Sequence, residues 1–107
     1  MSVRLSPLER RALDAFAQGV RMRFGDRLDA LTLFGSRARG EGRDDSDLDI
    51  LVLAKDLSRK ERRDILDLGA DVGLEHHLVL SPLVFDAKAW RADLPLGRAI
   101  AHDGVAL

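Results

Sequence analysis

Cysteine is absent from the 107-residue chain, which excludes disulfide bonds, thiolate zinc sites and a cysteine nucleophile. No stretch is apolar over the roughly 20 residues that a membrane-spanning helix needs. The first residues, among them Arg4, Glu9, Arg10 and Arg11, do not form the apolar core of a secretory signal. We therefore expect a protein of the reducing cytoplasm that has no membrane partner.

An excess of charge of either sign is also missing. The 17 Lys and Arg residues against 18 Asp and Glu residues give a net charge of −1, and aromatic residues make up only 5% of the chain. A near-neutral protein has no global field to attract a polyanion, and few aromatic rings leave few platforms for stacked bases. These features argue against a polynucleotide substrate but not against a single nucleotide.

What is present is the composition of an ordinary folded domain. Apolar residues make up 46% of the chain and charged residues 33%. A chain of this length buries a real core, and it contains no internal repeat, linker or low-complexity segment. We expect one domain over residues 1–107.

The most informative stretch contains two predicted strands, residues 28–34 and 47–53. The first is largely apolar, and the second contains the uninterrupted apolar run 50–53, which is typical of a strand buried on both faces. Between the strands lie a Gly-Ser turn at 35–36 and a polar loop at 40–46. The rest of the chain is organised around this pair.

Two aspartates open the second strand. Side chains two positions apart in a strand point to the same face, so Asp47 and Asp49 are expected to project together while Leu48 points into the core. Two like charges this close repel unless a cation relieves them. Mg²⁺ prefers carboxylate oxygens together with substrate phosphates, so the pair is a candidate magnesium site.

The turn before the loop supplies the other half of a candidate site. Gly35 lets the backbone approach a ligand closely, and Ser36 adds a hydroxyl and an N–H group at a possible helix start over residues 36–39. A helix N-terminus is a ready phosphate site. A phosphate cradle beside a carboxylate pair is the equipment for phosphoryl or nucleotidyl transfer.

The spacing of these residues resembles a known signature. Gly35-Ser36, ten residues and then Asp47-Leu48-Asp49 is similar to the motif of the DNA polymerase β-like nucleotidyltransferase superfamily. The longer strings at residues 35–40 and 46–52 most resemble its minimal nucleotidyltransferase (MNT) branch. The resemblance implies an α/β (α+β) nucleotidyltransferase fold, a small mixed β-sheet flanked by helices.

The resemblance also implies an activity. The protein would bind an NTP, most simply ATP, with Mg²⁺ or alternatively Mn²⁺, and transfer a nucleoside monophosphate to a hydroxyl acceptor. Gly35 and Ser36 would hold the triphosphate, and Asp47 and Asp49 would be the catalytic metal ligands.

The family pattern includes a third carboxylate on a later strand, which completes the metal site and often acts as the base. The segment 78–81 carries no acid, so Glu75 is the nearest candidate for a third metal ligand. The alternative is that Glu75 lies in a solvated loop. His76 and His77 are expected to be ordinary imidazoles, because a histidine pair without a third ligand at set spacing is weak evidence for a metal.

A minimal nucleotidyltransferase domain is about as long as this chain, so the resemblance leaves no residues for a separate acceptor-binding domain. Members of the MNT branch often pair with a helical HEPN toxin and transfer AMP to one of its tyrosines as antitoxins. The resemblance therefore implies a possible HEPN-type partner protein.

The first predicted helix begins at Ser6-Pro7, where Glu9 completes a capping-box pattern, and ends near Gly25. Apolar residues at helical spacing predict the face that packs on the sheet. These residues are Leu8, Ala12, Ala15, Phe16 and Val20.

A second capping-box pattern begins a helix at Ser58, and Gly69 or Gly73 is expected to end it. The third predicted strand, 77–85, contains Pro82, which favours a sheet edge or a bulge. A strand-helix-strand order predicts a right-handed crossover, so this strand would run parallel to the second.

Two further short helices are predicted near the end of the sequence. Asp86 is expected to cap one that contains Trp90. The other runs from Pro95, buries Leu96 and Ile100, and ends at Gly104.

Several charged residues of the central stretch have two interpretations. Arg37 and Arg39 could reach phosphates, or they could be surface charges that balance nearby acids. Asp44 and Asp45 are expected to be solvated turn residues rather than ligands.

Two hypotheses for the whole protein follow. In the first it is an active nucleotidyltransferase. In the second the site is weak or inactive, and the protein acts by binding a partner. The lack of an acid in segment 78–81 favours this second hypothesis. If the third carboxylate is the general base, its loss slows transfer by about a hundred- to ten-thousand-fold.

Overall fold

The computed structural model describes residues 5–41 and 47–107. The polar loop at 42–46, with Asp44 and Asp45, lies outside the described residues. The elements in chain order are α1 (Pro7–Phe24), β1 (Leu28–Phe34), β2 (Leu48–Ala54), α2 (Arg59–His76), β3 (Leu80–Asp86), α3 (Pro95–Asp103) and β4 (Val105–Ala106).

The four strands form one mixed sheet in the order β3-β2-β1-β4. β1 runs antiparallel to β2 and β4, whereas β2 and β3 are parallel and joined by α2. This confirms the predicted mixed sheet and the crossover. Pro82 lies on the edge strand β3, as expected of a residue that cannot donate to a sheet ladder.

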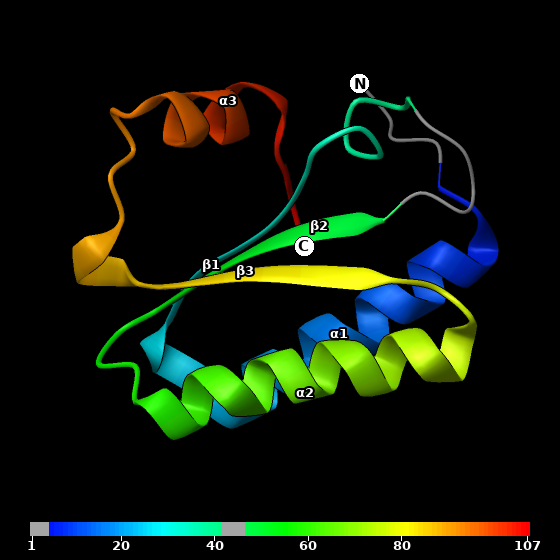
Figure 1. Ribbon diagram of the computed structural model, residues 1–107, viewed down its shortest axis with the longest axis horizontal. Coiled ribbons are helices and arrows are strands. Elements are labelled where there is room, and N and C mark those ends of the chain that lie inside the picture. Colours follow the sequence, from blue (N-terminus) through cyan, green and yellow to red (C-terminus); the bar gives the residue numbers. More distant parts are fainter. Residues whose placement is uncertain (1–4, 42–46) are drawn as a thin grey trace.

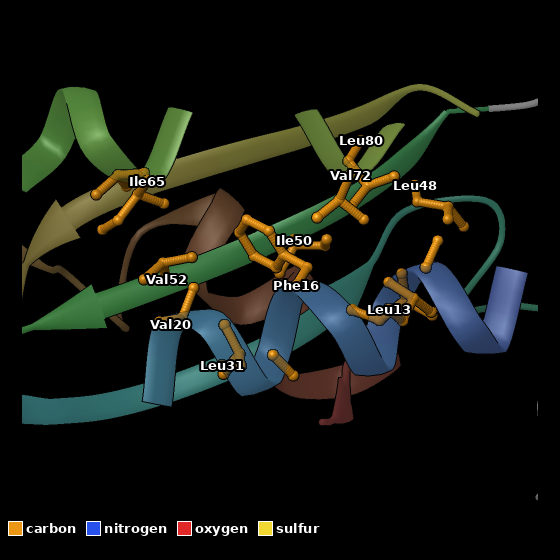
Figure 2. Close-up of a cluster of buried hydrophobic side chains, with 14 of the residues drawn as sticks. Leu13, Phe16, Val20, Leu31, Leu48, Ile50, Val52, Ile65, Val72 and Leu80 are labelled. Carbon is orange, nitrogen blue, oxygen red and sulfur yellow. The ribbon is translucent and has the colours of Figure 1, made fainter. Parts of the chain in front are cut away.

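Two helices cover one face of the sheet, and the third lies across the other face. In Figure 1, α1 and α2 lie together below the strands while α3 lies above them. The main core fills the layer between the sheet and α1 and α2, as Figure 2 shows. Its labelled members are Leu13, Phe16, Val20, Leu31, Leu48, Ile50, Val52, Ile65, Val72 and Leu80.

β2 is buried on both faces, as its apolar run predicts. Leu48 and Ile50 pack in the main core, whereas Leu51 packs on the opposite face with Ile100 of α3. Because side chains alternate along a strand, Asp49 projects to the α3 side of the sheet. This places the candidate site on the face that carries α3.

The ends of α1 agree with the sequence analysis, but its buried face differs. Ser6 and Glu9 form the capping box, and the helix stops at Gly25. Leu8 and Ala15, predicted to be buried, are exposed. The buried stripe is instead Glu9, Ala12, Leu13, Phe16, Ala17, Val20 and Phe24.

α2 is longer than predicted, because neither Gly69 nor Gly73 ends it. The helix continues to His76 and stops at His77, which adopts a left-handed conformation with φ 57°. A Cβ added to Gly69 would lie 2.7 Å from Cγ of Pro82, so this glycine lets α2 approach β3 closely. β3 accordingly begins at Leu80 rather than at residue 77.

In the last third of the chain, the one element that was not predicted is β4. Asp86 caps a short helix as expected, but this helix is a 3₁₀ turn, Ala87–Ala89, which ends before Trp90 and does not contain it. α3 buries Ile100 as expected, but Leu96 is 45% exposed and not buried. Gly104 ends α3, and β4 then pairs with β1.

No helix in the described ranges is both long enough and apolar enough to cross a membrane.

Candidate active site

The predicted phosphate turn and the aspartate pair lie at the same end of the sheet. β1 ends at Phe34, and antiparallel pairing places Phe34 directly beside Asp49 near the start of β2. Gly35 follows β1 and Asp47 immediately precedes β2. The fold therefore brings together two motif halves that are separated by ten residues of sequence.

The predicted helix start after Gly35 is a single closed turn. The N–H of Arg39 donates to the carbonyl of Gly35 at 3.3 Å, and the N–H of Glu41 donates to that of Ser36 at 2.9 Å. Gly40 has φ 74° and ends the turn in the manner of a Schellman motif. The left-handed glycine thus explains why no longer helix forms here.

Gly35 is in direct contact with Asp49. Gly35 has φ 80°, and a Cβ added to it would lie 2.4 Å from Oδ2 of Asp49. A side chain at position 35 would therefore both strain the backbone and displace the carboxylate. The glycine of the turn and the second aspartate of the pair form one structural unit.

The aspartates are arranged as strand alternation predicts. Leu48 is fully buried, Asp47 is exposed and Asp49 is partly buried. The pKa of Asp49 is raised above its ordinary value, first by burial and then by the negative charge of Asp47. The folded protein thus holds a carboxylate in a place where its ionised form is disfavoured.

This arrangement fits a divalent metal that is shared with a substrate. A cation would relieve the repulsion that raises the pKa of Asp49. Among residues 5–41 and 47–107, no three His, Cys, Asp or Glu side chains lie close enough together to hold a metal by themselves. Asp47 and Asp49 would therefore supply two ligands and leave the remaining positions to water and phosphate, as Mg²⁺ sites commonly do.

The strand position next to Asp49 carries a hydroxyl group rather than a third carboxylate. In the parallel register of β2 and β3, Ser81 pairs with Asp49 and projects to the same face. Glu75, the predicted third ligand, is exposed in the last turn of α2, before β3 begins. Its role as a metal ligand stays a prediction.

Arg37 fits neither of its two predicted roles, because it is buried in an ion pair. Its side chain is 5% exposed, and that of its partner Glu9 is 0% exposed. Nη2 and Nε of Arg37 donate to the two carboxylate oxygens of Glu9 at 2.8 and 2.9 Å. Nη1 donates to the carbonyl of Glu41 at 3.0 Å. The sequence shows no sign of this pair, whose members are 28 positions apart.

Arg37 also explains the ionisation of Glu9. Burial alone would raise the pKa of Glu9, but the hydrogen bond from Arg37, the backbone hydrogen bond from Ser6 and the charge of Arg37 together hold it below its ordinary value. Arg39, by contrast, is 40% exposed and pairs with Glu41 and with Asp103 of α3. The two arginines of one motif therefore have different environments.

Comparison with known proteins points to the same region. Residues 23–87 match the family described as Polymerase beta, Nucleotidyltransferase. A protein of Methanocaldococcus jannaschii, whose name gives an inferred protein adenylyltransferase activity, is 36% identical over 61 residues, which are 56% of this chain and 62% of that protein. This chain thus spans less than two thirds of that relative's length.

Solved structures share the fold. The structure of an inferred minimal nucleotidyltransferase superposes with a TM-score of 0.63 at 25% identity, covering 95% of this chain and 97% of that one. A tri-AMPylated Shewanella oneidensis HEPN toxin in complex with MNT antitoxin contains a similar chain, with a TM-score of 0.60 at 18% identity, covering 91% of this chain and 69% of that one. At such a low identity the second match shows a shared fold alone.

We predict that Arg37→Met destabilises the protein far more than Arg39→Met. Removing one partner of a buried ion pair leaves an uncompensated charge and costs roughly 3–5 kcal/mol, whereas an exposed pair contributes about 0–1 kcal/mol. Urea unfolding at pH 7 measures both variants. Equal effects would contradict the role of Arg37. The double variant Glu9→Gln, Arg37→Met should be less destabilised than Arg37→Met, because no buried charge remains.

The pH dependence of the wild type provides a further check on the Glu9–Arg37 pair. Because the pKa of Glu9 is lowered by folding, the stability that this carboxylate contributes is fully present above its ordinary value of 4.5. It is lost as the pH falls through the lowered value. In Glu9→Gln, that part of the decrease in folding stability at low pH should disappear.

A second prediction concerns Asp49. Because folding raises its pKa, metal-free protein loses stability as the pH rises from the ordinary value of 3.8 through the raised pKa. At pH 7 with a chelator present, Asp49→Asn should therefore melt at a higher temperature than wild type. The exposed Asp47→Asn should give a smaller increase. A lower melting temperature for Asp49→Asn at pH 7 would show that its carboxylate is not held in an unfavourable place.

Proposed function

Because this chain belongs to the polymerase beta nucleotidyltransferase family, we propose that it transfers AMP from ATP to a hydroxyl group with the help of Mg²⁺. One observation carries the proposal. The carboxylate of Asp49 lies against Gly35, and both burial and the charge of Asp47 raise its pKa. A divalent cation and an anionic substrate would bind to such a site together.

Each motif residue has a role in this proposal. The turn at Gly35-Ser36 holds the triphosphate through its backbone, which the absence of a side chain at position 35 permits. Asp47 and Asp49 hold the metal. When bound, Mg²⁺ would offset negative charge on the phosphate oxygens. The ion pair of Glu9 and Arg37 joins the turn to the start of α1 and keeps it in place.

The transfer itself is a substitution at the α-phosphorus of ATP. The hydroxyl oxygen of the acceptor attacks, a new P–O bond forms, and the bond between the α-phosphorus and the bridging oxygen breaks. Pyrophosphate leaves with the bonding electron pair, and the hydroxyl proton passes to a base or to water. In this proposal Asp47 and Asp49 would hold the metal beside the α-phosphate and the acceptor oxygen, so their chief contribution would be positioning.

For the acceptor we propose a hydroxyl group of a partner protein, such as a tyrosine of a HEPN-type toxin. Two similar proteins support this. One is a relative, an inferred protein adenylyltransferase that matches 56% of this chain. The other shares the fold and comes from a complex of an MNT antitoxin with a tri-AMPylated HEPN toxin. In this role the protein would act as an antitoxin.

A second candidate function is a binding module that acts without transfer. The observation that favours it is the register of β3, which places Ser81 rather than an acid beside Asp49, with Glu75 exposed on α2. Such a protein would neutralise its partner by docking alone. Its discriminating property is that loss of Asp47 and Asp49 leaves the partner inhibited.

The test of the proposal is thermal unfolding with ATP and Mg²⁺ together and with each alone. A ligand that binds only the folded protein stabilises it, by about 2.7 kcal/mol at 100 times its Kd. We expect an increase in melting temperature that requires both ligands and disappears in the double variant Asp47→Asn, Asp49→Asn. Each shift is measured against the same variant without ligand.

A charge-matched control is the double variant Asp29→Asn, Asp67→Asn, because both residues are exposed and lie outside the turn and the aspartate pair. It should keep the full ligand-dependent shift. Transfer is followed with ATP labelled at the α-phosphate or at the γ-phosphate, with a co-expressed HEPN-type protein as acceptor. AMP transfer predicts label from the α-position only. No ligand-dependent shift in wild type, together with no label on the partner, would contradict the proposal.

A further inference from the structure

The outer face of α2 carries an exposed apolar stripe. Leu66, Ala70 and Leu74 recur at helical spacing on this face, and the two leucines are 42% and 80% exposed. The opposite side of the helix, with Ile65 and Val72, packs in the main core. Figure 1 shows α2 and α3 on opposite sides of the sheet, so the stripe lies across the sheet from the candidate active site.

Charge is divided along the same helix. All the Lys and Arg residues of α2 lie in its first five positions, and every acidic residue except Glu61 follows them. Glu61 closes the capping box and pairs with Arg27. The basic residues are Arg59, Lys60, Arg62 and Arg63, and the later acidic residues are Asp64, Asp67, Asp71 and Glu75. The helix is therefore basic at its start and acidic toward its end.

This order of charges is the reverse of the one that a helix favours by itself. The helix dipole favours acidic groups near the N-terminus and basic groups near the C-terminus, whereas Arg59 lies in the first turn of α2 and Glu75 in the last. Within residues 5–41 and 47–107, the side chains of Arg59, Arg63, Asp71 and Glu75 form no ion pair that would offset this arrangement. A surface with the opposite order of charges, placed along α2, would offset it.

We propose that α2 docks against α2 of a second copy of this chain, with the two helices antiparallel. In this orientation the basic start of each helix lies along the acidic end of the other, so Arg59 and Arg63 of each copy face Asp71 and Glu75 of the other. A twofold axis relates the two copies, so each attraction occurs twice. The apolar stripes of the two helices cover one another along the same contact, and the flanking charges set the orientation.

The division of charge is the reason for choosing a second copy as the occupant of this face. A complementary surface must be acidic opposite Arg59 and Arg63 and basic opposite Asp71 and Glu75, and an antiparallel copy of α2 meets both requirements. A polyanion would be repelled by the acidic end of the helix. Because the aspartate pair projects to the α3 side of the sheet, both candidate active sites of the dimer stay open.

The test is sedimentation velocity of wild type and of two charge-reversed double variants at low ionic strength, over the micromolar range. Arg59→Glu, Arg63→Glu makes the whole outer face acidic, and Asp71→Lys, Glu75→Lys makes it basic. Each variant then brings like charges together in its own dimer, which should raise the dimer Kd by at least about tenfold. A mixture of the two variants in equal amounts should form a dimer again, because their outer faces carry opposite charge. Such recovery also shows that both variants are folded.

The matched control is the double variant Arg91→Glu, Arg98→Glu, which makes the same change in net charge at exposed residues outside α2. It should form a dimer as wild type does. High salt screens exposed charges, so it should weaken the wild-type dimer.

Three results would overturn the proposal. Wild type could sediment as a monomer, which would leave this face to solvent or to a different protein. Both charge-reversed variants could form dimers as wild type does, which would place the contact elsewhere on the molecule. The mixture of the two variants could remain monomeric, which would exclude an antiparallel contact through α2.

Discussion

The buried ion pair between Glu9 and Arg37 is the constraint on which the site depends. Glu9 serves two elements, because its carboxylate closes the capping box at the start of α1 and accepts two hydrogen bonds from Arg37. Arg37 in turn donates to the carbonyl of Glu41 at the end of the turn. The helix start and the turn are therefore fixed to one another. If the pair is broken, Gly35 loses the support that keeps it against Asp49.

A second constraint comes from β2, which is buried on both faces. Its apolar residues alternate between the main core and the α3 side, so the only direction left to Asp49 is toward the face with α3. There it meets Gly35 and the charge of Asp47, and its ionised form is disfavoured. The ionised carboxylate of Asp49 lowers the stability of the folded protein, and a bound cation and phosphate would restore that stability. Such perturbed ionisable groups are typical of binding and catalytic sites.

The parts of the fold that depend on local chemistry could be predicted from sequence. Capping boxes, the apolar run of β2 and the edge position of Pro82 all follow from neighbouring residues or from backbone chemistry. The parts that depend on distant partners could not. Gly69 or Gly73 is expected from sequence to end α2, because a glycine commonly ends a helix, whereas in the structure Gly69 lies where a side chain would collide with Pro82.

The candidate site divides in the same way. Spacing and alternation predicted the pairing of Asp47 with Asp49 and the buried Leu48 between them. The buried role of Arg37 and the position of Ser81 beside Asp49 depend on tertiary packing and strand register, for which the sequence has no local signal.

The central claim is that the turn and the aspartate pair form one metal–nucleotide site. Its most direct test is paramagnetic broadening of backbone amide NMR signals by Mn²⁺ in the presence of a non-hydrolysable ATP analogue. Carboxylates and water accept Mn²⁺ in place of Mg²⁺. We predict that substoichiometric Mn²⁺ broadens the signals of Gly35 and Asp49 first and leaves Asp86, at the far end of β3, sharp. Broadening centred on His76 and His77, or unchanged broadening at Gly35 in Asp49→Asn, would contradict the account.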